Sequence, residues 1–346
     1  MRVLIDTTYV ARAPFSGTAI YITRLIETLR ALGEVEPLEV ANARRRPPSG
    51  GGAGSLANLA TDLWWTSVEL PRLARAHRAE VIHHPLPARS HGARIPQVIT
   101  VHDLAFELLP EAFDSRFRLY AHLTHRAAAR AAGAVVAVSE TTATDVGRLW
   151  GVRPERIVVA HHGPGQLIER RPRPDAPGHY LYVGDAEPRK DLATLIAAYR
   201  IYRERAAQPL GLIIAGPGAP VEPAAGIRVE TAVTAERLAE LHAGAAALVH
   251  PSRHEGFGLT VLEAMTAGTP VLAADAPGVR EVCGPAALYF TAADASALAD
   301  KLAQIAADHE LRDQLATAGA TRAADFTWES AARSHAAAYS LATGRP

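Results

Sequence analysis

Residues 247–270 read ALVHPSRHEGFGLTVLEAMTAGTP, and this short stretch combines the patterns of a strand, a glycine turn and a helix. The apolar run 247–252 is typical of a buried strand, and 259–267 has the pattern of a helix that ends at Gly268. The turn at 256–258 supplies two glycines, which let a ligand approach the backbone closely. Free N–H groups at the helix start favour an anion. The stretch therefore predicts an α/β fold with an anion site at a strand end.

Two glutamates flank this turn, Glu255 before it and Glu263 about one helical turn after it. A carboxylate at Glu263 can accept two hydrogen bonds from a cis-diol such as that of ribose. Glu255 lies at the mouth of the loop, where it can accept hydrogen bonds from sugar hydroxyls. The stretch is thus equipped for a ribose, a phosphate and a sugar, although a plain strand-loop-helix unit with two solvated glutamates is an alternative interpretation.

A second stretch, YLYVGDAEPRKDLATLIAAY (180–199), repeats the order strand, turn, helix. Arg189 and Lys190 stand at its helix start, where the positive end of the helix dipole disfavours cations. A bound diphosphate would compensate, because arginine can bind two oxygens at once and lysine supplies a point charge. The alternative is a solvated basic pair.

Short apolar runs alternate with helical patterns along the whole chain, which predicts parallel sheets covered by helices on both faces. The expected strands are 2–6, 37–41, 81–84, 97–103, 134–139, 156–162, 180–185, 210–216, 227–230, 247–252, 270–275 and 287–290. Helical patterns include 19–32, 191–206 and 326–342. Ligands of open parallel sheets bind beyond the carboxyl ends of the strands, so we expect the functional residues to follow strands.

The segment GPGQLIERRPRPDAPG (163–178) interrupts the alternation and predicts a linker between two α/β halves. A second segment, ARRRPPSGGGAGS (43–55), is rich in Gly, Pro and Ser and predicts a loop. Its arginines and the following Trp64 and Trp65 could touch an anionic membrane or a lipid-linked acceptor, but the favoured interpretation is a solvated loop and two buried tryptophans. Whether this loop meets a membrane or a substrate stays open.

Composition narrows the function classes. The 346 residues suit two domains, and 36 basic residues balance 36 acidic ones, so the basic footprint of a nucleic-acid-binding protein is missing. The single cysteine excludes an intrachain disulfide and fits a reducing compartment. The N-terminus is typical of a first strand rather than of a signal peptide, and no apolar run is long enough to span a bilayer. We expect a cytoplasmic protein, with peripheral contact to the inner face of the membrane as an open alternative.

At the two glycine-turn stretches the sequence resembles the retaining glycosyltransferases of family 4, which have the GT-B fold. The family block EGFGLxxLEAMAxGxPV is matched by EGFGLTVLEAMTAGTPV (255–271), and VGxxxPRKxLxxLI by VGDAEPRKDLATLI (183–196). Weaker similarities lie at 100–113, 135–146, 156–163, 278–290 and 326–332. The stretch TVHDLAFELLPEAF (100–113) is similar to a subgroup rich in bacterial mannosyltransferases.

This resemblance implies a GT-B architecture, in which two Rossmann-like parallel-sheet domains face each other across a cleft. The implied parts are an acceptor-binding domain at 1–165, a linker at 166–177, a nucleotide-sugar-binding domain at 178–326 and a helix at 327–346 that crosses back to the first domain.

The resemblance also implies roles for individual residues. Glu263 would hold the ribose, Arg189 and Lys190 the diphosphate, and Glu255 the hydroxyls of the donor sugar. His102 would lie near the anomeric carbon. The implied catalytic residues are His102, Glu255, Arg189 and Lys190. The implied donor-binding residues are Gly17, Arg189, Lys190, Glu255, Gly256, Phe257, Gly258, Leu259 and Glu263, and the acceptor-side residues are His102, Asp103 and Ser139.

The implied reaction is retaining transfer of a hexose from a nucleotide sugar to a glycan, lipid-linked or small-molecule acceptor, with mannose from GDP-mannose as the best match. A UDP-hexose donor and a catalytically silent nucleotide-sugar-binding protein are the alternatives, and a phosphorylase or epimerase on the same fold is a third. No cofactor and no metal are expected, because Asp-x-Asp, His-Glu-x-x-His and paired-cysteine motifs are absent. At 17–21 the sequence GTAIY departs from the family's Gly-Ile-Gly-Arg-Tyr by one glycine and its basic residue.

Overall fold

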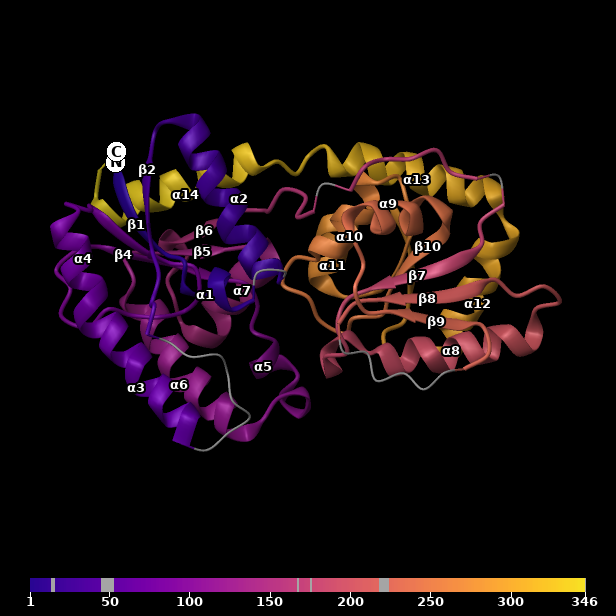
Figure 1. Cartoon of the computed structure of the whole chain (residues 1–346), viewed down its shortest axis with the longest axis horizontal. Helices are drawn as coiled ribbons and strands as arrows, with labels where there is room; N and C mark the ends of the chain where they lie inside the picture. The colour runs from indigo at the N-terminus through magenta and orange to yellow at the C-terminus, as the bar shows by residue number, and fades with distance from the viewer. Residues whose placement is uncertain (14–15, 45–52, 167, 175, 218–223, 346) are drawn as a thin grey trace. The chain divides into compact units, whose positions relative to one another are not determined.

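The computed structural model describes residues 1–13, 16–44, 53–166, 168–174, 176–217 and 224–345, and it contains two six-stranded parallel sheets (Figure 1). The chain divides into two compact units. Unit 1 comprises residues 1–107, 113–163 and 327–346, and unit 2 comprises 108–112 and 164–326. Residues 108–112, expected within the first domain, thus cluster with the second unit. Most of the predicted loop 43–55 lies outside the described residues.

The sheet of unit 1 has the strand order β2-β1-β3-β4-β5-β6. Its strands are β1 (Arg2–Asp6), β2 (Glu36–Val40), β3 (Val81–His84), β4 (Gln97–Val101), β5 (Ala134–Ala137) and β6 (Ile157–Val159). Its helices are α1 (Thr8–Arg12), α2 (Gly17–Leu32), α3 (Ala53–Trp64), α4 (Leu70–Ala76), α5 (Ala105–Leu108), α6 (Ser115–Ala131), α7 (Glu140–Trp150) and α14 (Trp328–Thr343), and a π-helical turn, Trp65–Glu69, joins α3 to α4.

Alternate residues of these strands pack into two separate hydrophobic cores, one on each face of the sheet. Val3, Ile5 and Val98 pack beneath α2 and α14, whereas Leu4 and Ile82 pack beneath α4 on the opposite face. Because both faces are covered, the strands read as continuous apolar runs rather than as an apolar–polar alternation.

The sheet of unit 2 has the order β12-β11-β10-β7-β8-β9. Its strands are β7 (His179–Val183), β8 (Gly211–Ala215), β9 (Ile227–Glu230), β10 (Ala245–His250), β11 (Val271–Ala274) and β12 (Ala287–Phe290). Its helices are α8 (Leu192–Arg205), α9 (Ala235–Gly244), α10 (Leu259–Thr266), α11 (Pro277–Cys283), α12 (Ala295–Ala307) and α13 (His309–Ala323), and a 3₁₀ turn, Pro188–Lys190, precedes α8.

All twelve expected strands are present, most of them one to three residues shorter at an end, and the expected helices correspond to α2, α8 and α14. The expectation of two buried tryptophans is wrong for one of them. Trp65 is 4% exposed, but Trp64 is 47% exposed. Adjacent helical residues point about a quarter-turn apart, so one of two neighbours on a surface helix often faces solvent.

Helix α14 completes unit 1 although it is the last element of the chain. It packs on α2 and on β3, β4, β5 and β6. The contact is close: a Cβ added to Gly133 would lie 2.9 Å from Cβ of Ala342. Buried Ala332, Ala338 and Tyr339 supply the apolar face that covers the sheet.

A buried hydrogen-bonded network joins α14 to the sheet. Tyr21 Oη lies 2.8 Å from Thr100 Oγ1 and 2.7 Å from His335 Nε2. His83 lies 2.9 Å from both Thr100 Oγ1 and Tyr339 Oη. Burial lowers the pKa of His335 to about 4 and that of His83 well below its usual range, so the network holds neutral imidazoles at neutral pH.

Acid should therefore weaken the fold through His335. Its folded-state pKa lies below the unfolded value, so its stability contribution is present above pH 6.5 and is lost as the pH falls toward 4. A shift of this size corresponds to about 3 kcal/mol. We expect the free energy of urea unfolding to fall more steeply between pH 6.5 and pH 4.5 in the wild type than in His335→Gln. Parallel pH profiles for the two proteins would contradict this.

Candidate active site

Except for Gly17, which begins α2 in unit 1, the candidate donor residues follow the carboxyl ends of β7 and β10 in unit 2. From β7 the chain proceeds outward to β8 and β9, and then returns to place β10 on the other side of β7. Neighbouring loops leave the sheet in opposite directions at such a switch point, which opens a crevice for a ligand. Arg189 and Lys190 follow β7, and Glu255 follows β10.

Glu255 is the centre of a charged cluster. Arg189 Nη1 donates to its Oε2 at 3.0 Å, Ser252 Oγ donates to its Oε1 at 2.8 Å, and His250 Nε2 lies 3.5 Å from Oε1. Burial by itself would raise the pKa of Glu255, but Arg189, His250 and Lys190 outweigh it and hold that pKa well below its usual range. Glu255 is therefore a permanent acceptor at neutral pH.

Glu263 is the fifth residue of α10 and lies in a different environment. It is buried, and its Oε1 accepts one hydrogen bond from the backbone N–H of Gln166 at 2.7 Å. Burial raises its pKa to about 7, and the single N–H only partly offsets this effect. The two glutamates of one short stretch thus differ in charge at mildly acidic pH.

The turn between them depends on glycine. Gly258, directly before α10, has φ +100°, a left-handed conformation that other residues rarely adopt, and no side chain caps the helix there. A Cβ on Gly278 at the start of α11 would collide with the carbonyl oxygen of Glu255. The first amides of α10 therefore stay available to an anion next to Glu255.

Arg189 and Lys190 lie in the 3₁₀ turn rather than in the first turn of α8, where the sequence predicted them. Asp191 caps α8 through Thr194 N–H and so separates the two cations from the helix dipole. Each cation has an acidic neighbour: Glu187 Oε2 lies 2.8 Å from Arg189 Nε, and Asp185 Oδ1 lies 3.0 Å from Lys190 Nζ. These acids hold the cations in place at the end of β7.

The acceptor-side candidates lie in unit 1. His102 follows β4, and its Nε2 donates to the carbonyl of Pro85 at 3.0 Å. Burial lowers the pKa of His102, although Pro85 and Asp103 oppose the shift. A carbonyl only accepts, so Nε2 carries the proton and Nδ1 of the neutral ring is an acceptor.

Asp103 and Ser139 have structural contacts of their own. Asp103 Oδ1 accepts from Ala105 N–H at 2.9 Å at the start of α5, and Ser139 Oγ accepts from Thr142 N–H at 2.9 Å at the start of α7. Gly17 begins α2, after the capping residue Ser16. These residues shape helix starts near the carboxyl edge of the sheet.

Two contributors to the cluster were not predicted from the sequence. His250 ends β10 and Ser252 follows it, and both face Glu255. Their position at a strand end was the available signal, because functional side chains of parallel sheets gather there. No group of three or more metal-ligating side chains is found within the described ranges, and no helix in them is long and apolar enough to cross a membrane.

Comparison with known proteins agrees with this architecture. Residues 166–322 match the family model of glycosyl transferases group 1, and residues 15–164 match that of glycosyltransferase family 4. The O-antigen chain mannosyltransferase B of Escherichia coli is 28% identical over 292 residues, which cover 77% of this chain and 76% of that protein.

Solved structures share the fold over nearly the whole chain. Sucrose-phosphate synthase from Thermosynechococcus elongatus superposes with a TM-score of 0.75 at 20% identity and covers 98% of both chains. The Anabaena protein HepE in complex with UDP-glucose superposes with a TM-score of 0.70 at 18% identity, over 97% of this chain and 98% of that one. The chain therefore belongs to glycosyltransferase family 4 and is a hexosyltransferase with the GT-B fold.

Proposed function

We propose that this hexosyltransferase transfers a hexose from a nucleotide sugar to an acceptor hydroxyl with retention of configuration, and that mannose from GDP-mannose is the first donor to test. The observation that carries the proposal is the cluster at the ends of β7 and β10. It combines an ionised carboxylate, two cations and uncapped helix amides at a topological switch point. A nucleotide sugar carries the matching groups: sugar hydroxyls, a diphosphate and a ribose diol.

The proposed roles follow from the charge of each residue. Glu255 stays ionised and accepts hydrogen bonds from sugar hydroxyls. Arg189 and Lys190 bind the diphosphate and stabilise the negative charge that grows on it as the glycosidic bond breaks. Gly256, Phe257, Gly258 and Leu259 bring their backbone to the phosphates, and Glu263 accepts from the ribose diol. The departing phosphate takes the proton of the acceptor.

On the acceptor side, we propose that neutral His102 accepts a hydrogen bond through Nδ1 from an acceptor hydroxyl. Asp103 and Ser139 then act by fixing the helix starts beside it. Gly17 begins the helix that carries Tyr21, whose ring packs edge-on against His102 at 4.9 Å between centroids. Asp103, Ser139 and Tyr21 thus help to place one hydrogen-bonding imidazole, that of His102.

The identity of the donor's base is the part of the proposal that the relatives support least. The relative from Escherichia coli is named as a mannosyltransferase, which supports a mannosyl donor, whereas HepE was solved with UDP-glucose, which supports a UDP-hexose. A protein that binds a nucleotide sugar without transferring it is the remaining alternative. The presence of Glu255, Arg189, Lys190 and His102 favours transfer over binding alone.

A thermal-shift panel tests the donor directly. Ligands that bind only the native state raise the apparent melting temperature by mass action. The panel contains GDP-mannose, UDP-glucose, UDP-GlcNAc, UDP-galactose, ADP-glucose and dTDP-sugars. We expect a clear shift with GDP-mannose, and a shift with a UDP-sugar alone would replace GDP-mannose by that donor. No shift with any member would contradict the proposal.

Glu263 predicts a pH-dependent donor affinity. Above its pKa of about 7 the carboxylate accepts both ribose hydroxyls, and below it the protonated acid loses part of that capacity. We expect the Kd of the nucleotide sugar to be several-fold lower at pH 8 than at pH 6. In Glu263→Gln the Kd should rise about tenfold and lose most of its pH dependence.

Calorimetric titration of the donor at both pH values makes this measurement. A nucleotide sugar is a suitable ligand because its diphosphate is a diester and does not titrate in this range. Glu310→Gln, in the first turn of α13, is the matched control and should behave as the wild type. Equal pH dependence in Glu263→Gln and the wild type would show that another group titrates.

Arg189→Ala should slow transfer far more than it weakens binding of the nucleoside part. Loss of one donor to a developing charge typically costs about a hundredfold or more in rate. Arg189→Lys should recover part of the loss, because it restores the charge but not the two-pronged geometry. Initial rates at saturating donor give the comparison, and Arg205→Ala, an exposed arginine on α8, is the control. Full activity in Arg189→Ala would remove this residue from the site.

We also propose that the reaction needs no metal, because Arg189 and Lys190 supply the charge that a divalent cation provides elsewhere. Treatment with EDTA should leave the rate of transfer unchanged. A loss of activity that is restored by Mg²⁺ or Mn²⁺ would contradict this.

A further inference from the structure

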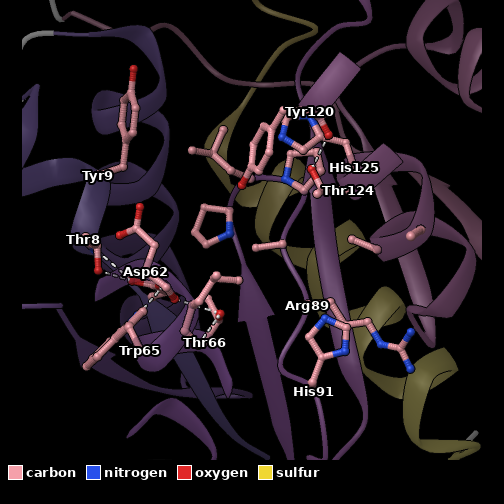
Figure 2. Close-up of a pocket in the computed structure, with 18 of the residues that line it drawn as sticks. Thr8, Tyr9, Asp62, Trp65, Thr66, Arg89, His91, Tyr120, Thr124 and His125 are labelled. Carbon is pink, nitrogen blue, oxygen red and sulfur yellow. Dashed lines mark hydrogen bonds between the residues drawn. The ribbon is translucent and has the colours of Figure 1, made fainter. Parts of the chain in front are cut away.

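Unit 1 contains a pocket of about 510 Å³ that no sequence motif pointed to (Figure 2). Asp6 ends β1, Pro85 directly follows β3, and both line the pocket. Strand β1 runs on to β2 on one side, while β3 lies on its other side, so the pocket is at the switch point of this sheet. It is therefore the position in unit 1 that corresponds to the donor cluster in unit 2.

One side of the pocket is polar and rigid. Figure 2 shows Thr8, Asp62 and Thr66 on the same side, near Trp65. Asp6 is hydrogen-bonded to two of the lining residues. Its Oδ2 accepts from Trp65 Nε1 at 2.8 Å, and its Oδ1 accepts from Thr8 Oγ1 at 2.5 Å. Carboxylates and hydroxyls beside an aromatic ring are the groups that recognise a sugar.

The rim of the pocket is apolar and exposed. Leu63 is 54% exposed, Leu86 36%, Tyr120 46% and Leu123 61%, and all four line the pocket. Exposed Trp64 follows Leu63 on α3, and exposed Leu119 precedes Tyr120 on α6. Large apolar side chains gathered around one opening mark a binding surface rather than ordinary surface composition. A free sugar would leave this rim uncovered, whereas an alkyl chain would cover it.

The charge around the opening favours an anion. Arg12 and Arg89 line the pocket, and Asp6 on the polar side is already hydrogen-bonded to Trp65 and Thr8. Arg89 and His91 line the pocket on the side opposite Asp62 in Figure 2. A phosphate-type group at the boundary between the polar side and the apolar rim would therefore meet complementary charge.

The pocket is also connected to His102. Pro85 contributes to the lining, and its carbonyl accepts the hydrogen bond from His102 Nε2 at 3.0 Å. A ligand in the pocket is therefore separated by Pro85 from His102, the residue that the proposed mechanism uses to place the acceptor hydroxyl.

From these observations we propose that the pocket binds the acceptor, and that the acceptor is a sugar joined through a phosphate-type anion to an apolar chain. The sugar lies against Asp6, Asp62 and Trp65, the anion near Arg89, and the first part of the chain over Leu63 and Leu123. This assignment rests on the proposed transferase function and names the substrate class of its acceptor side.

Three probes separate the parts of this ligand. The first is a hexose joined through a diphosphate to a medium-length alkyl chain, the second is the same hexosyl diphosphate without the chain, and the third carries the chain through a neutral ether. Binding of each probe to the whole protein is measured by titration, below the concentration at which the probe forms micelles. This measurement does not require transfer. We expect the first probe to bind at least about tenfold more tightly than either of the others.

Matched variants locate the binding. Leu63→Gln/Leu123→Gln changes two exposed side chains of the rim, so the fold should be retained, and it should raise the Kd of the first probe about tenfold. Leu341→Gln is the control, because Leu341 is a 42% exposed leucine on α14 that does not line the pocket. Arg89→Gln should reduce the preference for the diphosphate probe over the ether probe several-fold. Equal affinity for probes with and without the chain, or an unchanged Kd in the double variant, would overturn the assignment.

Binding to lipid vesicles distinguishes an acceptor site from a membrane contact. If the double variant loses binding to sugar-free anionic vesicles but binds the first probe as the wild type does, the rim is a membrane contact and the acceptor assignment is wrong. The nucleotide-sugar thermal shift is measured on the same variants and should be unchanged. Chain-dependent probe binding together with no shift by any nucleotide sugar would support the ligand class of the pocket and count against the transferase proposal.

Discussion

The direction of the strands is the constraint on which the rest of this structure depends. Every strand of both sheets is parallel to its neighbours, so every loop that follows a strand emerges at the same edge of its sheet. A side chain placed one to six residues after a strand is then near others placed in the same way, however distant they are in sequence. Arg189 and Glu255 are 66 residues apart and still form a hydrogen bond of 3.0 Å.

This constraint explains why one short stretch can hold two glutamates with different properties. Glu255 lies in the loop, where the end of β7 brings Arg189 to it, and its charge is compensated. Glu263 lies on a helix beneath the loop, where burial dominates and one backbone N–H is its partner. Glu255 therefore suits a hydrogen bond that must be accepted at any pH near neutral. Glu263 suits a hydrogen bond that forms when the ligand binds. Their environments, rather than their residue type, separate the two roles.

The strands and most helices could be predicted from sequence because buried parallel strands leave uninterrupted apolar runs such as VLAA (271–274), which local pattern detects. The position of Arg189, Lys190 and Glu255 at strand ends could be predicted for the same reason, since they follow those runs. The partners of Glu255 could not, because the meeting of Ser252, His250 and Arg189 depends on the order of strands in the sheet. The pocket of unit 1 was missed because α1, α3, α6 and the loop after β3 each contribute a few residues and none carries a pattern of its own. Trp64 was wrongly predicted to be buried. The sequence pattern shows that a helix is amphipathic but not where its boundary with solvent lies.

The return of the chain to unit 1 has a consequence for the acceptor side. Helix α14 brings His335 into hydrogen-bond contact with Tyr21, and the same tyrosine packs edge-on against His102. Tyr21 also binds Thr100, two residues before His102 on β4. The position of His102 is thus fixed from two sides. Its Nε2 is hydrogen-bonded to the carbonyl of Pro85, and its ring packs against Tyr21, which belongs to the network that includes the last helix. Because the imidazoles of that network are neutral, it adds no charge beside His102. The last helix therefore both covers the sheet and holds in place the imidazole that we propose contacts the acceptor.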